Sequence, residues 1–167
     1  MYLYHIPQVV GVGLSHHTIE SLIQRYSKII VGIKDSSCER DHSVGLAKTF
    51  MPGITVYVGN ELDLPTLGKM GSTGAISGLA NFLPRTVHRM VKSPNGPEIN
   101  QDIATVSKLL EMVRPMSLMP ALKGVMAHLT QNPNWLRVRP PLVALTQDEF
   151  KPLSQALRSL SLNENQA

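Results

Sequence analysis

Lys34 is the residue whose position points most directly to covalent chemistry. It ends the run IIVGIK at residues 29–34, whose other members are apolar or glycine. Such a run is typical of a strand buried on both faces, as in a parallel sheet covered by helices. Enzymes built from strand–helix repeats place catalytic groups at the ends of these strands, where an amine in apolar surroundings becomes a nucleophile. The alternative is a lysine that reaches solvent at the sheet edge or pairs with Asp35.

Tyr4 closes an earlier strand, predicted at residues 1–6. If the two strands are parallel neighbours, the Tyr4 hydroxyl comes close to Lys34, where a phenol can relay protons during imine chemistry. The alternative is a strand-end tyrosine that packs its ring and leaves its hydroxyl in water. The two residues together predict a site that neither of them would establish alone.

The elements that would position these residues alternate between strands and helices. Strands are predicted at residues 1–6, 29–34, 54–58 and 74–78, and helices at 19–26, at 39–51 and after Asp63 and Pro84, with Ser15 as an N-cap. Helices also follow at 98–113, 118–130 and 148–160, around an irregular segment at 132–147, and the last five residues are expected to fray. This order predicts a parallel α/β fold: four βα units over residues 1–95, and helices over 96–167 that complete the same domain.

Composition excludes several classes of protein. The 167 residues are 43% apolar and 17% charged, as in soluble globular proteins, and no apolar run reaches the roughly 18 residues of a membrane span. Basic residues are scattered and aromatic residues make up only 5%, which argues against a nucleic-acid surface. One cysteine, Cys38, and no export signal favour a cytoplasmic location.

The histidines do not predict a metal site. His16 and His17 are adjacent, so they point apart on a helix. The other histidines have no ligand partner at metal spacing along the chain; they are His5, His42, His88 and His128.

Three segments carry a family resemblance: YHIP at 4–7, VGIKDSS at 31–37 and GSTGAISGLANFLP at 71–84. In this order and spacing, together with VRPPL at 138–142, they resemble the dihydrodipicolinate synthase/N-acetylneuraminate lyase family. The resemblance implies a partial (β/α)8 TIM barrel, of which this chain supplies strands five to eight with their helices and a C-terminal helical extension.

The resemblance also implies roles for individual residues. Lys34 would form a Schiff base with pyruvate or a related 2-oxo acid, and Tyr4 would shuttle protons while an aldehyde partner reacts. The substrate-binding positions would be Gly74, Ile76, Ser77, Gly59 and Asn60. Neither a metal nor an organic cofactor is implied.

Two departures from the family pattern qualify these roles. Members that form dihydrodipicolinate carry an arginine where this chain has Val9, which favours a sugar-acid or other 2-oxo-acid lyase. A full barrel needs about 250 residues, so the first four βα units and their substrate-gripping glycine/threonine loop are expected to be missing. The chain is therefore a carbon–carbon or carbon–oxygen lyase if the barrel is completed. The alternative is a catalytically silent half-barrel that self-associates or pairs with a separate N-terminal half.

Overall fold

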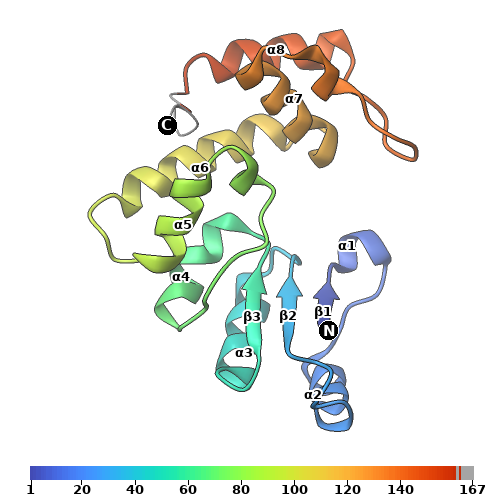
Figure 1. Ribbon diagram of the computed structural model, residues 1–167, viewed down its shortest axis with the longest axis vertical. Helices are drawn as coiled ribbons and strands as arrows, with labels where there is room; N and C mark the ends of the chain where they lie inside the picture. The colour runs from blue at the N-terminus through green and yellow to red at the C-terminus, as the bar shows by residue number, and fades with distance from the viewer. Residues whose placement is uncertain (161, 163–167) are drawn as a thin grey trace. The chain divides into compact units, whose positions relative to one another are not determined.

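The computed structural model describes residues 1–160 and 162, which fall into two compact units, Met1–Asn100 and Gln101–Ala167. The first contains β1 (Tyr2–His5), α1 (Pro7–Val10), α2 (His16–Arg25), β2 (Gly32–Asp35), α3 (Arg40–Phe50), β3 (Thr55–Val58), the 3-10 helix η1 (Glu61–Asp63), α4 (Leu64–Lys69), η2 (Leu79–Asn81) and α5 (Pro84–Lys92) (Figure 1). The second is helical, with α6 (Ile99–Val113) starting just before the boundary, then α7 (Leu118–Thr130), η3 (Pro133–Leu136) and α8 (Gln147–Leu157). No described helix is long and apolar enough to cross a membrane.

The three strands form a parallel sheet in the order β1-β2-β3, which confirms the predicted α/β alternation (Figure 1). One register line joins Tyr4, Lys34 and Tyr57 across the sheet, and the next joins His5, Asp35 and Val58. Because side chains alternate between the two faces of a strand, the first line projects to one face and the second to the other.

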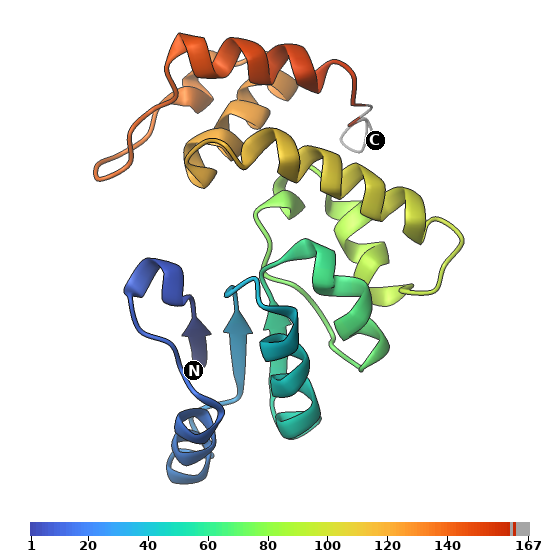
Figure 2. The same cartoon turned by 180° about the vertical axis from the view of Figure 1, so that it is seen from behind.

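The face that carries His5 and Asp35 is the packed one. Ile33 and Val56 lie on it fully buried, and α2 and α3 cover it through Ile19 and Leu46 (Figure 2). Ser15 caps α2 as predicted, since its hydroxyl accepts a hydrogen bond from the Thr18 amide at 3.1 Å. The opposite face, which we call the front face, carries Tyr2, Tyr4, Lys34, Thr55 and Tyr57.

The predicted fourth strand at 74–78 is wrong. Only one isolated parallel bridge, between Val58 and Ala75, joins this segment to the sheet. The chain leaves the sheet at Ser77, whose hydroxyl accepts hydrogen bonds from the amides of Leu79 and Ala80 at 3.1 and 3.3 Å. These bonds favour the helical turn η2 over continued strand pairing.

The helices of the second unit lie where their apolar spacing predicts them. Helix α7 has the predicted bounds, and α8 begins with a capping box in which Thr146 and Glu149 satisfy each other's backbone amides. The irregular segment between them contains only the short helix η3. The tail predicted to fray, at 163–167, lies outside the described residues.

Candidate active site

Lys34 and Tyr4 meet at the carboxyl ends of β2 and β1. They are register partners, and Lys34 Nζ donates a hydrogen bond of 3.1 Å to Tyr4 Oη. The same Nζ lies 4.3 Å from the centre of the Tyr4 ring. The predicted proximity of the two groups is confirmed, since parallel pairing in this register brings them to the same face at the same height.

The phenol of Tyr4 is tuned by its neighbours. Burial acts to raise its pKa, but the Ser36 hydroxyl, the Lys34 hydrogen bond and the positive charge of Lys34 together hold the pKa of Tyr4 below its ordinary 10.0. A phenol that gives up its proton more easily exchanges it more readily with an adjacent amine or hydroxyl. The pair therefore brings a primary amine and a phenol of lowered pKa into direct contact.

Two further tyrosines, Tyr2 and Tyr57, line the front face beside this pair. Their rings stack with centroids 5.5 Å apart and planes 18° apart. They meet above Gly32, where a Cβ would overlap the Tyr2 ring. The hydrogen bond between the two tyrosines, followed by burial, raises the pKa of Tyr57, although Thr73 opposes this. Both residues were missed in the sequence analysis. Two-residue alternation places Tyr2 on the same face as Tyr4, and it places Tyr57 on the face opposite the buried Val56.

Gly59 and Asn60, the predicted substrate-binding residues after β3, lie in a hydrogen-bonded turn. The Gly59 amide donates to the Asp35 carbonyl at 2.7 Å. The Asn60 side chain donates to Asp63 at 2.6 Å, and Arg40 contacts the other oxygen of this carboxylate at 2.6 Å. The Asn60 amide is thus used to organise the turn between β3 and α4.

The three predicted residues on either side of the bridging residue Ala75 lie in different surroundings. Gly74 lies against the front face, where a Cβ would sit 3.1 Å from the Tyr57 ring. Ile76 is 45% exposed. The Ser77 hydroxyl donates to the buried Glu61 carboxylate at 2.5 Å. Gly74 therefore lies beside the Tyr57 ring, on the face of the sheet that carries Lys34.

The pairing of Lys34 with Asp35, one of the alternatives considered for this lysine, is wrong. Asp35 lies on the packed face, 1% exposed, where its carboxylate accepts three hydrogen bonds. The donors are His42 Nδ1 at 3.0 Å, Ser43 Oγ at 2.6 Å and the Ser37 amide at 2.9 Å. Burial acts to raise the pKa of Asp35, but these donors outweigh it and hold the pKa below 3.8.

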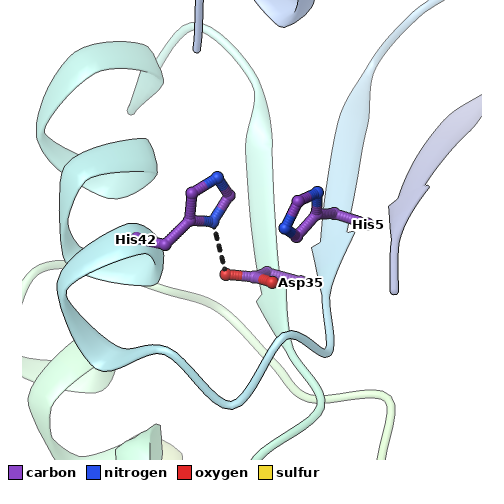
Figure 3. A group of neighbouring side chains, drawn as sticks. All are labelled: His5, Asp35 and His42. Carbon is purple, nitrogen blue, oxygen red and sulfur yellow. Dashed lines mark hydrogen bonds and ion pairs between the residues drawn. The ribbon is translucent and has the colours of Figure 1, made fainter. Parts of the chain in front are cut away.

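His5 and His42 do find a shared partner, contrary to the sequence-based expectation. With Asp35 they form a cluster whose possible ligand atoms lie within 4.8 Å of one another, and this is the set of described residues that could hold a metal ion (Figure 3). Residues 5, 35 and 42 come from β1, β2 and α3, so their spacing along the chain could not reveal the cluster.

The geometry of this cluster fits a hydrogen-bonded assembly better than a metal centre. The His5 and His42 rings stack with centroids 4.2 Å apart and planes only 16° apart. Imidazole lone pairs lie in the ring plane, so two nearly parallel stacked rings cannot aim them at one ion. In addition, His5 Nδ1 already accepts the Leu14 amide at 2.9 Å, which leaves the proton of the neutral ring on Nε2.

Comparison with known proteins places these features in a family. The model of the dihydrodipicolinate synthetase family matches residues 1–160. An uncharacterized DapA-like lyase from Chloroflexus aurantiacus is 28% identical over 155 residues, 92% of this chain and 51% of the relative. A 4-hydroxy-tetrahydrodipicolinate synthase from Acetivibrio thermocellus is 25% identical over 163 residues, 96% and 54%. The chain therefore spans about half the length of the curated relatives that it matches.

Solved structures show the same fold. Dihydrodipicolinate synthase from Agrobacterium tumefaciens aligns with a TM-score of 0.84 and 31% identity over 95% of this chain and 53% of that one. A prophage protein of the dihydrodipicolinic acid synthase family from Escherichia coli, solved in complex with pyruvate, aligns with a TM-score of 0.83 and 23% identity, covering 96% and 56%. With the family match over nearly its whole length, the chain belongs to the dihydrodipicolinate synthetase family.

Proposed function

We propose that this chain carries the Schiff-base centre of a lyase or aldolase that acts on pyruvate or a related 2-oxo acid and an aldehyde. The observation that carries the proposal is the 3.1 Å contact between Lys34 Nζ and Tyr4 Oη at the ends of adjacent parallel strands. In the family's barrel, β1, β2 and β3 would be strands five, six and seven. The other half would come from a second copy of the chain or from an N-terminal half-barrel.

Lys34 would act as the nucleophile. Its neutral amine attacks the carbonyl carbon of the 2-oxo acid, and loss of water gives an imine. The protonated imine withdraws electrons, so a proton leaves the neighbouring carbon and an enamine forms. The enamine carbon then bonds to the aldehyde carbon, and hydrolysis of the new imine releases the product and the free amine. The cleavage direction runs through the same steps in reverse.

Tyr4 would move the protons that these steps require. Its hydroxyl already shares a hydrogen bond with the amine, and its lowered pKa suits exchange with the carbinolamine oxygen or the aldehyde oxygen. Gly74, Ile76, Ser77, Gly59 and Asn60 remain the proposed substrate-binding positions. Val9 is 72% exposed in α1 and offers no positive charge, which supports a substrate other than that of dihydrodipicolinate-forming members.

The test is reductive trapping. The chain is incubated with pyruvate and sodium borohydride, and the intact protein and its peptides are weighed. We expect a mass gain of one reduced pyruvyl group, located on Lys34. Lys34→Ala should abolish the gain, and Lys28→Ala, which removes a lysine outside the strands, should retain it.

Two outcomes would contradict the proposal. One is an unchanged mass after treatment of the wild-type chain. The other is a mass gain that survives Lys34→Ala, which would show nonspecific modification of surface amines. Repeating the reaction with pyruvate omitted shows whether borohydride alone alters the protein.

A further inference from the structure

The two strand ends at the candidate site carry a second pair of residues directly behind the first. Tyr4 and Lys34 are register partners on the front face, and the next residues, His5 and Asp35, are register partners on the packed face. Any force that fixes His5 and Asp35 therefore also fixes the backbone from which the tyrosine and the lysine project.

Asp35 anchors the end of β2 to the chain that follows it. Its carboxylate, 1% exposed, binds the Ser37 amide in the turn after the strand and both His42 and Ser43 in α3. A buried carboxylate with several donors is costly to displace, since any donor that is lost leaves part of the charge unpaired. The β2 end is thus tied to the first turn of α3.

His5 anchors the end of β1 in a similar way. Its side chain is buried, and its Nδ1 accepts the amide of Leu14 from the segment before α2 at 2.9 Å. One face of its ring is covered by the His42 ring, and the two ring centroids are 4.2 Å apart. The last ladder hydrogen bond of β1 is also here, from the Ser36 amide to the His5 carbonyl at 2.8 Å.

His42 is the residue that contacts both anchors. It donates from Nδ1 to Asp35 and stacks its ring on His5 (Figure 3). A third histidine, His16 of α2, meets the His42 ring edge-on at 5.1 Å and supports it from the side. A single imidazole on α3 thereby links the ends of β1 and β2 across the back of the sheet.

We propose that His42 is a positioning residue that sets the separation between Tyr4 and Lys34 from the opposite face of the sheet. It does so through two distinct contacts, a hydrogen bond to Asp35 and a ring contact to His5. Proton transfer requires the phenol and the amine to stay within about 3.2 Å, and small displacements of catalytic groups can cost up to roughly a hundredfold in rate. The catalytic consequence rests on the proposed Schiff-base function, whereas the positioning itself does not.

The test separates the two contacts of His42. His42→Asn keeps a donor near the position of Nδ1 and loses the ring, His42→Phe keeps a ring and loses the donor, and His42→Ala loses both. We expect His42→Ala to slow pyruvate trapping at Lys34 by roughly tenfold or more, with the other two variants in between. Ser43→Ala is the matched control, because it also removes a donor to Asp35 but leaves the ring that stacks on His5 in place.

A second readout does not depend on pyruvate. An amine-reactive acylating reagent is applied, and the ratio of modification at Lys34 to that at Lys28 is measured by peptide mass spectrometry. Tyr4→Phe calibrates the change in this ratio when the hydroxyl contact is lost. We expect His42→Ala to shift the ratio in the same direction, and Ser43→Ala to leave it close to the wild-type value.

The possible outcomes distinguish a failure of the proposed function from a failure of the positioning role of His42. A wild-type chain that traps no pyruvate contradicts the proposed function, and the acylation ratio still decides the role of His42. A His42→Ala ratio equal to wild type overturns the positioning role, as does an equal shift in Ser43→Ala at the same thermal stability. If His42→Ala fails to fold by circular dichroism, His42→Asn and His42→Phe decide the matter, and wild-type ratios in both overturn the proposal.

Discussion

An amine and a phenol share a 3.1 Å hydrogen bond at the ends of two neighbouring strands, and the charge of the lysine helps to lower the pKa of the tyrosine. The lysine therefore changes the proton affinity of the tyrosine through both its hydrogen bond and its charge. This effect depends on the register of β1 and β2, which a search of the sequence for a reactive lysine does not supply.

Substituting Tyr4→Phe should keep the ring beneath Lys34 Nζ and remove only the hydroxyl. We expect pyruvate trapping at Lys34 to slow by about a hundredfold or more, because general acid–base groups typically contribute that much. The measurement is the initial rate of borohydride-trapped adduct by mass spectrometry. Tyr26→Phe, at the end of α2, is the control. An unchanged rate in Tyr4→Phe would remove Tyr4 from the mechanism.

His5 should make the stability of the first unit depend on pH. Burial, then electrostatic repulsion from His42 and to a smaller extent from His16, lowers the pKa of His5 below 6.5, against the opposing charges of Asp35 and Glu39. The unfolded chain therefore takes up this proton at higher pH than the folded chain. The free energy of unfolding should fall as the pH drops from above 6.5 through the lower folded pKa.

The comparison that isolates His5 uses His5→Asn, whose side-chain oxygen can still accept the Leu14 amide. Urea unfolding followed by circular dichroism is measured at several pH values between about 5 and 8. The slope of stability against pH should be smaller in His5→Asn than in wild type. His128, whose pKa burial also lowers, remains in both proteins and contributes equally. Equal slopes would argue against a proton-linked role for His5.

Among the elements, β2 has little room for a larger side chain at Gly32. A Cβ at Gly32 would overlap the Tyr2 ring and approach the Thr55 carbonyl oxygen to 2.7 Å. We expect Gly32→Ala to lower the free energy of unfolding by about 1–3 kcal/mol, the usual cost of inserting a methyl group into packed structure. Thermal and urea unfolding measure the loss.

A double variant separates the two obstacles at Gly32. Tyr2→Ala removes the ring but not the backbone carbonyl of Thr55. The stability lost through Gly32→Ala should therefore be smaller in the Tyr2→Ala variant than in the wild type, but not zero. Strictly additive losses in the two single variants would mean that the ring and the new methyl group do not meet.

In the molecule as a whole, the outer edge of β1 leaves backbone hydrogen-bonding groups without a strand partner among the described residues. Within the described residues β1 pairs with β2 alone, and its Met1 and His5 carbonyls face that neighbour. The backbone groups of Tyr2 and Tyr4 therefore face outward, since alternate residues of a strand address opposite sides. Exposed apolar side chains at Val9, Val10 and Val12 follow directly after this strand.

Such an edge favours association. We expect the average mass from light scattering to rise above that of a monomer with increasing protein concentration. A Val9→Lys/Val12→Lys double variant should weaken the association without unfolding the chain, since these side chains are 72% and 71% exposed. A monodisperse wild-type monomer across the same concentrations would show that the edge needs no partner.

The parallel α/β order and most helix positions could be predicted from the sequence alone, and so could the approach of Tyr4 to Lys34. Local signals sufficed for the strands and helices, because an apolar run of strand length, a two-residue alternation and a capping serine act through neighbours along the chain. The contact between Tyr4 and Lys34 also required the parallel pairing of β1 and β2. The same locality explains the failure at 74–78, where Ser77 turns the backbone into η2 after one bridge.

The groups behind Tyr4 and Lys34, on the packed face of the sheet, could be identified only in the folded protein. His5, Asp35 and His42 are separated by 30 and 7 residues, and they meet because β1, β2 and α3 pack together. The stacking of Tyr2 on Tyr57 over Gly32 likewise spans all three strands. A sequence states which residues lie on a given face, but the register of the sheet and the placement of a helix over it decide which of them touch.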